Sequence, residues 1–262
     1  MYRRIPRCAR RGNRRSRRNY GRRRRRKLNA IFKKELRSYF SSPIGYVFVA
    51  IFFCVAGLLF TVYNIFYRMG DISYVFSNMT MIFLFLTPVL TMRLLSEDKK
   101  AKTDQLLLTA PVKVVSVVLG KFLSAVAVLA IALATTLIFP IILKVYTDPA
   151  WGEIWSNYIG FCLLGASFIS IGLYISSLTE NQIIAAIATF GVLFVLYLTN
   201  NFAVSFGDGF INTVIQWFSP ANKFTDFSKG IISIESVIYY LSIMAAFVIL
   251  TTAHIEKRRW IK

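Results

Sequence analysis

Residues Val47–Tyr67 read VFVAIFFCVAGLLFTVYNIFY and contain no charged side chain. An apolar run of about 20 residues is long enough to cross the hydrocarbon core of a bilayer as a helix. Backbone polar groups in lipid need partners within the segment, which favours a helix. Strands of a membrane barrel are shorter and alternate strictly between apolar and polar residues, unlike this run. The stretch therefore predicts a membrane-spanning helix.

Five further runs of the same kind follow it. They lie at Val75–Leu95, Val114–Leu143, Ile154–Leu178, Ile183–Phe202 and Val237–Ala253. The chain is 56% hydrophobic, which is more apolar surface than a soluble domain can bury. The second of these five is longer than a crossing requires, so we expect it to tilt or to extend beyond the membrane. The predicted fold class is an all-α membrane protein with six transmembrane helices.

The positive charge of the chain is concentrated in residues 1–27, which contain fourteen Arg, one Lys and no acidic residue. Taking these fifteen from the 32 basic residues of the chain leaves 17 basic against 12 acidic, a net charge of +5 for residues 28–262. Such a tail cannot bury a core and is predicted to be disordered. One interpretation is an arm that binds nucleic acid or anionic lipid. We prefer another, in which residues 1–27 are upstream sequence that is not translated.

An amphipathic helix is predicted for Leu28–Ser42, LNAIFKKELRSYFSS. Apolar residues at helical spacing are Leu28, Ile31, Phe32, Leu36, Tyr39 and Phe40, and the basic residues Lys33, Lys34 and Arg37 fall elsewhere around the helix. This pattern is typical of a helix in the membrane interface with its basic groups toward lipid phosphates. A helix packed on its own protein is the rival interpretation. Ser42 and Pro43 fit the N-cap and first position of the first span.

The orientation of the chain follows from its basic residues. If the N-terminus is cytoplasmic, the inner side holds Lys33, Lys34, Arg37, Arg93, Lys99, Lys100, Lys102, Lys113, Lys121, Lys257, Arg258, Arg259 and Lys262. The outer side then holds only Arg68, Lys144, Lys223 and Lys229. Thirteen against four is the bias expected for a cytoplasmic face. Both termini are therefore predicted to be cytoplasmic.

Two further segments constrain the arrangement of the spans. The linker Thr179–Gln182 is so short that spans four and five must be antiparallel neighbours. Span four carries Gly160, Gly165, Ser167, Ser170 and Gly172, and small residues permit close helix approach. Pro140 is expected to kink span three. Between spans five and six, helical spacing of apolar residues over 209–231 predicts two short amphipathic helices lying on or dipping into the outer leaflet.

The sequence lacks the motifs of several kinds of chemistry. There is no GxxxxGK[ST] phosphate loop, so we expect no direct ATP binding. Three scattered cysteines and the single His254 predict neither a disulfide nor a metal site. No pattern indicates catalytic residues. No span carries an ionisable residue near its middle, which disfavours a secondary transporter.

The segment Ser96–Lys121, SEDKKAKTDQLLLTAPVKVVSVVLGK, lies between spans two and three. Ser96 is predicted to cap a helix whose first turn holds Glu97 and Asp98, where the helix dipole favours acids. Three consecutive leucines then give a short helix an apolar side, and Pro111 ends it. A one-sided helix of this kind suits a groove on a partner protein. A solvated connector over the inner ends of the spans fits the pattern equally well.

The same segment resembles the signature of the type-2 family of ABC permeases: two acids and two bases, then Gly-Thr-Leu-Glu, Leu-Leu-Leu-Thr-x-Pro and Leu-Gly-Lys. The matching residues are Glu97, Asp98, Lys99, Lys100, Thr103, Leu106, Leu107, Leu108, Thr109, Pro111, Leu119, Gly120 and Lys121. Lys102, Asp104 and Gln105 depart from the usual Gly, Leu and Glu. The resemblance runs from Leu28 to the end of the chain. The segment SPANKFTDFSKGIISIESVIYYLS, residues 219–242, is similar to the gliding-motility and copper-enzyme-maturation permeases of that family.

The resemblance implies a permease domain over residues 28–262, the membrane subunit of an exporter in a bacterial plasma membrane. It implies an elbow helix at 28–42 and outer helices that re-enter the membrane before span six. Its implied partners are the bilayer, two separate subunits that bind ATP and Mg, and a second copy or a sister permease. The segment 97–111 would be the coupling helix that receives the motion of the ATPases, through the residues Glu97, Asp98, Lys99, Lys100, Thr103, Leu106, Leu107, Leu108, Thr109 and Pro111.

We therefore predict a non-enzymatic permease with no cofactor of its own. Its elbow residues are Ile31, Phe32, Lys33, Lys34, Leu36, Arg37 and Phe40. A stand-alone secondary transporter or channel is the first alternative. The second is a membrane-tethered protein whose arginine-rich tail binds nucleic acid or anionic lipid, although we do not expect nucleic acid among the partners.

Overall fold

The computed structural model describes residues 29–100, 114–146, 149–205 and 220–261. These residues form helices joined by short segments, and they include no strand, so the predicted all-α class is confirmed. In chain order the elements are a helix over residues 29–41, α2 (Pro43–Phe60), the π-helical segment η1 (Thr61–Phe66), α3 (Ser73–Thr91), α4 (Arg93–Lys100), α6 (Val114–Thr135), α7 (Ile138–Tyr146), α8 (Trp151–Leu178), α9 (Gln182–Ser205), α11 (Pro220–Ser228) and α12 (Ile234–Ile261).

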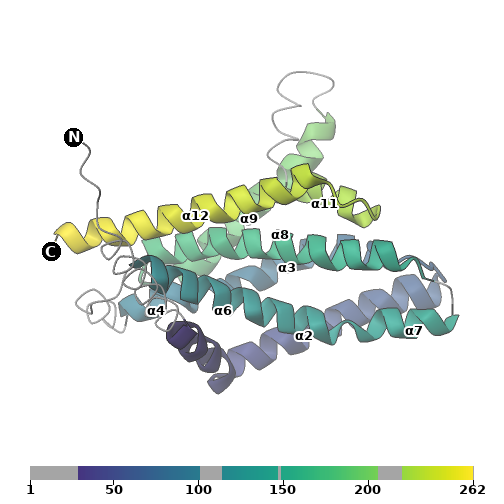
Figure 1. Ribbon diagram of the computed structural model, residues 1–262, viewed down its shortest axis with the longest axis horizontal. Coiled ribbons are helices and arrows are strands. Elements are labelled where there is room, and N and C mark those ends of the chain that lie inside the picture. Colours follow the sequence, from purple (N-terminus) through teal and green to yellow (C-terminus); the bar gives the residue numbers. More distant parts are fainter. Residues whose placement is uncertain (1–28, 101–113, 147–148, 206–219, 262) are drawn as a thin grey trace, which may run out of the picture.

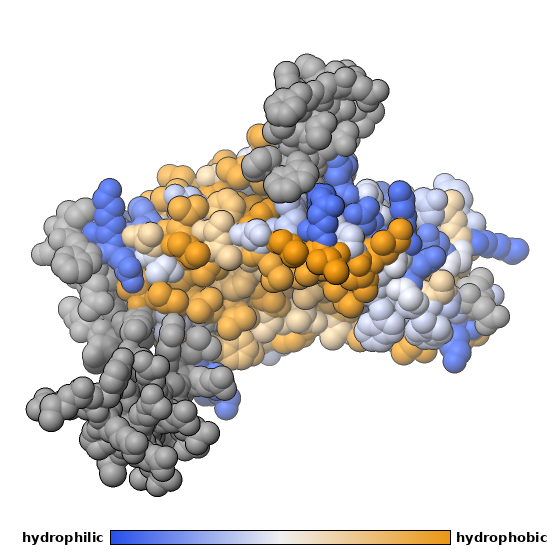
Figure 2. Space-filling model, turned by 45° about the horizontal axis from the view of Figure 1, so that its top comes forward, coloured by the Kyte–Doolittle hydropathy of each residue, from blue (hydrophilic) through white to orange (hydrophobic). Residues whose placement is uncertain are grey.

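Among the described residues, six helical stretches are long and apolar enough to cross a membrane, as predicted. They are Pro43–Phe66, Ser73–Lys100, Val114–Tyr146, Trp151–Leu178, Gln182–Thr199 and Ile234–Lys257. The second combines α3 with α4, and the third combines α6 with α7. Figure 1 shows them lying along the long axis of the molecule. Figure 2 shows an apolar band across the middle of the visible face and hydrophilic residues toward its two ends, the distribution expected of a membrane protein.

Helix α8 forms the centre of the bundle. It contacts α3, α4, α6, α9, α11 and α12. In its most apolar stretch 78% of the residues are buried, against 17% in α9 and 28% in α2 and α12. The core is therefore built around the fourth span, and α2, α9 and α12 present most of their apolar side chains outward.

Glycines allow the close approach of helices to α8. A Cβ atom added to Gly160 would lie 2.6 Å from Cβ of Phe227, and one added to Gly172 would lie 2.8 Å from Cβ of Thr91. Both distances are well inside van der Waals contact, so only glycine fits without moving a helix. The predicted close packing of span four is confirmed at these positions. The loop after Leu178 is short, and α8 and α9 pack against each other as the linker predicted.

The third span is interrupted between α6 and α7, near the proline that predicted a kink. Pro140 lacks an N–H group and cannot bond to the carbonyl of Thr136, one turn earlier. Tyr158 of α8 donates a hydrogen bond from its hydroxyl to that carbonyl at 2.8 Å. The same carbonyl also accepts a hydrogen bond from the backbone N–H of Phe139 at 3.0 Å, so a side chain of the central helix adds a second bond at the break.

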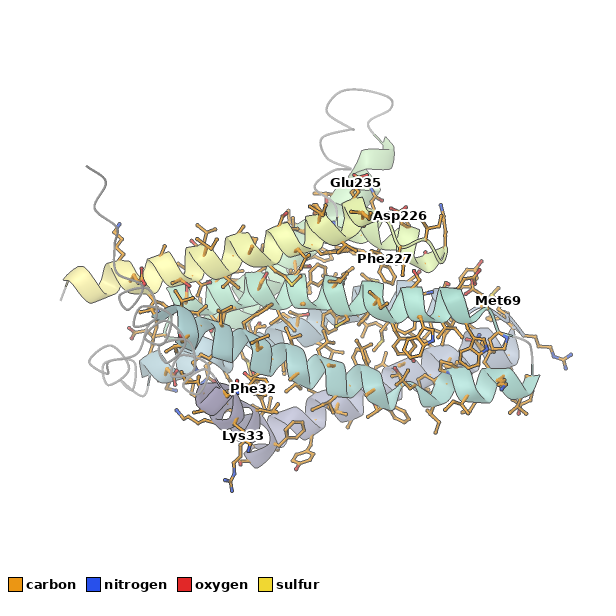
Figure 3. The ribbon with its side chains drawn as sticks, in the orientation of Figure 1. Phe32, Lys33, Met69, Asp226, Phe227 and Glu235 are labelled. Atoms are coloured by element: carbon orange, nitrogen blue, oxygen red, sulfur yellow. The ribbon has the colours of Figure 1, made fainter. Side chains whose placement is uncertain are left out.

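The two ends of the bundle differ. The 29–41 helix, α4 and the last turns of α12 lie at one end, which we call the α4 end (Figure 1). The opposite end, which we call the α11 end, holds α11, the segment around Met69 and the start of α8 (Figure 3). The apolar face of α11 is covered by the protein, because Phe224 and Phe227 are buried in the core. The first of the two predicted outer helices falls at residues outside the described ranges.

The 29–41 helix is amphipathic. Lys33, Lys34 and Arg37 are exposed, whereas Ile31, Phe32, Leu36 and Phe40 are partly buried. Leu36 and Phe40 pack against the hydrophobic core, and Figure 3 shows Phe32 on the bundle side of this helix. Part of its apolar face therefore rests on its own protein.

The predicted N-cap at Ser96 is wrong. Helix α4 already begins at Arg93 and continues from α3 after a single residue, Met92. The Ser96 hydroxyl donates back to the carbonyl of Met92 within the helix, so it is not available to cap a new one. Glu97 and Asp98 accordingly lie in the second turn of α4 and not in a first turn.

Candidate functional site

Four elements meet at the α4 end of the bundle: the 29–41 helix, α4, the first turns of α6 and the last turn of α8. Helix α4 matters most for function, because the chain leaves it at Lys100 and enters the leucine-containing segment for which the sequence predicts a partner. The contacts that hold α4 define the candidate site.

Lys121 of α6 joins two of these elements through ion pairs. Its Nζ atom lies 3.1 Å from Oε2 of Glu35 in the 29–41 helix and 2.8 Å from Oδ2 of Asp98 in α4. The Lys121 side chain is 3% exposed, against 15% for Glu35 and 22% for Asp98. We call this group the Lys121 triad. A cation this deeply buried is tolerated only when it is paired, so the triad ties three elements to one point.

Gly120, the residue before Lys121, brings α6 and the 29–41 helix close together. A Cβ atom on Gly120 would lie 2.7 Å from Cγ2 of Ile31, so a larger residue there would displace the 29–41 helix. The close approach at Gly120 is also what places Glu35 within reach of Lys121. Both residues belong to the Leu-Gly-Lys part of the motif, and each has a distinct structural role.

A second set of contacts links the 29–41 helix to the junction of α3 and α4. The hydroxyl of Tyr39 donates a hydrogen bond to the carbonyl oxygen of Leu90 at 2.9 Å. Burial raises the pKa of Tyr39, which keeps this hydroxyl protonated and able to donate. Arg93 binds both carboxylate oxygens of Glu97, at 2.6 and 2.7 Å, and donates to Oγ of Ser42 at 3.2 Å. The arginine therefore bridges α4 and the start of α2.

Helix α4 is attached to α8 on its other side. The hydroxyl oxygen of Ser176 accepts hydrogen bonds from the backbone N–H groups of Leu95 and Ser96 at 3.2 and 3.1 Å. The same hydroxyl donates to the carbonyl of Met92. Lys99 donates from Nζ to the carbonyl of Ser177. With polar contacts on two sides, α4 cannot shift without moving α8, α6 or the 29–41 helix.

The structure divides the sequence-predicted coupling residues into two groups. Glu97, Asp98, Lys99 and Lys100 are in α4, and two of them make the contacts given above with Arg93 and Lys121. The others, Thr103, Leu106, Leu107, Leu108, Thr109 and Pro111, lie outside the described residues.

Sequence reasoning missed the roles in the site of Glu35, Tyr39, Arg93, Lys121, Ser176 and Ser177. A signal for Glu35 and Lys121 was present. Glu35 is the only acid between Leu28 and Ser42, and Lys121 begins a long stretch without charges. Ionisable residues beside apolar spans need partners, so these two charges were candidates for one another.

We predict that Tyr39→Phe lowers the free energy of unfolding by about 1 kcal/mol, because it removes one buried hydrogen bond and changes little else. Thermal unfolding of the purified protein in detergent would measure it. Tyr46→Phe is the control, since Tyr46 is 61% exposed. Equal stabilities of the two variants would contradict a contribution from the Tyr39 hydrogen bond.

The contacts of the site join helices to one another. Among the described residues no group of three or more His, Cys, Asp or Glu side chains is placed to hold a metal ion. The arrangement is a short helix, α4, at one end of the bundle, and ion pairs and hydrogen bonds attach it to several spans.

Comparison with known proteins agrees with this picture. The family model described as ABC-2 family transporter protein matches residues 29–255, which include every element of the site. No curated protein matches the chain. Members of this family are non-catalytic transmembrane subunits that function with ATP-binding subunits. The chain belongs to the ABC-2 transporter family, as a multi-pass membrane component of such a transporter.

Proposed function

We propose that the chain is the permease of a bacterial exporter in the plasma membrane and that its α4 end faces the cytoplasm. Two ATP-binding subunits dock on residues 97–111, the coupling segment, and a second permease chain completes the pathway. The orientation is supported by the thirteen basic residues that the sequence assigns to the cytoplasmic side against four on the outer side, since Lys33, Arg93 and Lys121 of the larger group lie in elements of the α4 end. The apolar side chains that α2, α9 and α12 present outward can contact lipid and a second permease.

The Lys121 triad is the observation that carries this proposal. It connects Asp98, near the start of the coupling segment, with the 29–41 helix and the third span. Closure of the ATPase dimer on ATP pushes the coupling segment, and α4 moves with it. The triad passes that movement to α6 and to the 29–41 helix, which braces the bundle. The two permeases then rock between inward-facing and outward-facing states.

The end of α3 is a point at which α4 can bend relative to the rest of the second span. Pro88 lies inside α3 and removes the backbone bond to the residue one turn earlier, and Met92 separates α3 from α4. The peptide N–H of Met92 still donates to the carbonyl of Pro88 at 2.9 Å. Helix α4 can therefore tilt as a unit relative to the span that precedes it.

We predict that Leu107→Asp reduces recovery of the ATPase subunit at least about tenfold, because a charge in an apolar docking face must lose its water. The test is affinity purification of residues 28–262 from the native membrane in mild detergent, followed by identification of the proteins that accompany it. Ile231→Asp is the matched control. It places the same charge at the α11 end, on a residue that is 58% exposed.

Recovery of an ATP-binding subunit with the unchanged chain and with Ile231→Asp, but not with Leu107→Asp, supports the proposed docking segment. Equal recovery with all three chains contradicts it. A permease without any ATPase at native expression would instead favour the stand-alone transporter.

A further inference from the structure

A pocket of about 410 Å³ opens at the α11 end, between the end of the first span and the end of the third. Phe60, Ile65, Leu143 and Tyr146 supply most of its apolar lining, from η1, α7 and the last residue of α2. Asn64 and Arg68 add two polar groups. This volume and this mixture of many apolar groups with a few polar ones are typical of ligand sites. None of these residues takes part in the contacts of α4, so the pocket is separate from the proposed ATPase coupling.

Asn64 is buried and has an unused acceptor. Its side-chain N–H₂ group donates to the carbonyls of Met69 and Asp71, at 2.7 and 3.2 Å. These two bonds fix which way the amide faces and hold the turn after η1. Its Oδ1 atom has no hydrogen-bond partner among the described residues, although the residue is only 8% exposed. A buried acceptor left without a donor is costly, and a ligand with a hydroxyl or amine would supply one.

Arg68 is held in an unfavourable backbone conformation. Its φ angle is 53°, and among the described residues no other non-glycine residue has a positive φ. The left-handed region disfavours a residue with a Cβ atom, and here it ends η1, because the N–H of Met69 turns back to donate to the carbonyl of Tyr63 at 3.1 Å. The Arg68 guanidinium has no carboxylate within ion-pair distance in the described part of the chain. The rim of the pocket therefore carries an available positive charge.

The surroundings of the pocket are those of a membrane boundary. Residues Phe66, Tyr67 and Tyr146, at the ends of the two spans, are 82%, 67% and 74% exposed. Aromatic side chains at span ends are typical of the level of lipid head groups. An opening at this level is within reach of lipid head groups.

We propose that this pocket binds one anionic phospholipid. The phosphate pairs with Arg68, a hydroxyl of the head group donates to Oδ1 of Asn64, and an acyl chain lies along Phe60, Ile65 and Leu143. The charge of the guanidinium, the unused acceptor and the apolar wall each recognise a different part of such a molecule. The lipid would hold the end of η1 against α7 and so fix the first span relative to the third.

The test measures thermal unfolding of delipidated protein in detergent, with and without added dioleoylphosphatidylglycerol. We expect the lipid to raise the Tm of the unchanged chain, because a ligand that binds only the folded state stabilises it. Arg68→Gln should need at least about ten times more lipid for the same rise, since it loses a charge-assisted hydrogen bond. Lys229→Gln removes an equal charge from an exposed residue after α11 and should respond like the unchanged chain.

Two further arms identify the ligand. Phosphatidylcholine, which has no net charge and no hydroxyl donor, should raise the Tm less than phosphatidylglycerol. Glycerol phosphate has the head group without the acyl chains and should produce no rise at the same concentration. A rise from glycerol phosphate equal to that from the lipid would overturn the proposal of a lipid site.

Arg68→Gly separates the role of the side chain from that of the backbone. Glycine adopts a positive φ without strain, so this variant should unfold at a higher temperature than the unchanged chain when no lipid is present. It should also lose most of the response to phosphatidylglycerol. Equal lipid responses from Arg68→Gln, Arg68→Gly and Lys229→Gln would overturn the assignment of Arg68 as the anion-binding residue.

Discussion

Replacing Lys121 with methionine is expected to lower the free energy of unfolding by about 3 kcal/mol. The change leaves Glu35 and Asp98 close together without the cation that both contact, and removing one partner of a buried charge group typically costs 3–5 kcal/mol. We place the expected cost at the lower limit because these two carboxylates are 15% and 22% exposed, so that water partly solvates them. Equilibrium unfolding of the purified chain in detergent measures the difference.

Two controls distinguish charge pairing from loss of packing. Lys144→Met makes the same change on an exposed lysine at the end of α7 and should alter stability by less than about 0.5 kcal/mol. The triple variant Lys121→Met, Glu35→Gln, Asp98→Asn removes all the charges of the triad and should regain most of the lost stability. A Lys121→Met protein as stable as Lys144→Met would contradict the importance of the triad for folding.

The same triple variant tests the proposed transmission. If the triad passes the movement of α4 to α6 and to the 29–41 helix, a stable triple variant that still recovers its ATPase on purification should transport poorly for each ATP hydrolysed. Normal coupling in the stable triple variant would show that the triad serves stability alone.

The spans were predictable because one physical requirement determines them. A run such as Val47–Tyr67 has no competing structure in lipid, and its length alone indicates a crossing. The close packing at the glycines of α8 and the break in the third span near Pro140 were also predictable from the sequence, since each has a steric cause. The spans and the break depend on residues near one another in the chain, and the close packing of α8 depends on the small size of its glycines.

The site was less predictable because its contacts join distant residues. Glu35 and Lys121 are 86 positions apart, and nothing in either segment specifies the other as its partner. The error at Ser96 has a similar origin. Local preferences favour a cap at a serine followed by two acids, but the helix continues through it, with the N–H of Ser96 bonded to Ser176 of a different span. The role of Leu106, Leu107 and Leu108 remains a prediction from the motif.

Gly172→Leu is expected to destabilise the protein by about 3 kcal/mol, at the upper end of what overpacking usually costs. A Cβ atom at Gly172 would lie 2.8 Å from Cβ and 2.9 Å from Cγ2 of Thr91, which is fully buried in α3. A rotamer change cannot move a Cβ atom, so α3 and α8 would have to separate. Unfolding in detergent would measure the loss.

The separation should also disturb the site, because Thr91 is the last residue of α3 and α4 begins two residues later. Matched controls are Gly152→Leu, on the same helix, and Gly191→Leu, within the fifth span, because a Cβ atom at either glycine meets nothing within 4 Å. Both should fold with nearly unchanged stability. A Gly172→Leu protein as stable as these controls would mean that α3 and α8 tolerate a wider spacing. The position of α4 would then depend on its polar contacts with Ser176, Ser177 and Lys121 more than on the packing of the two spans.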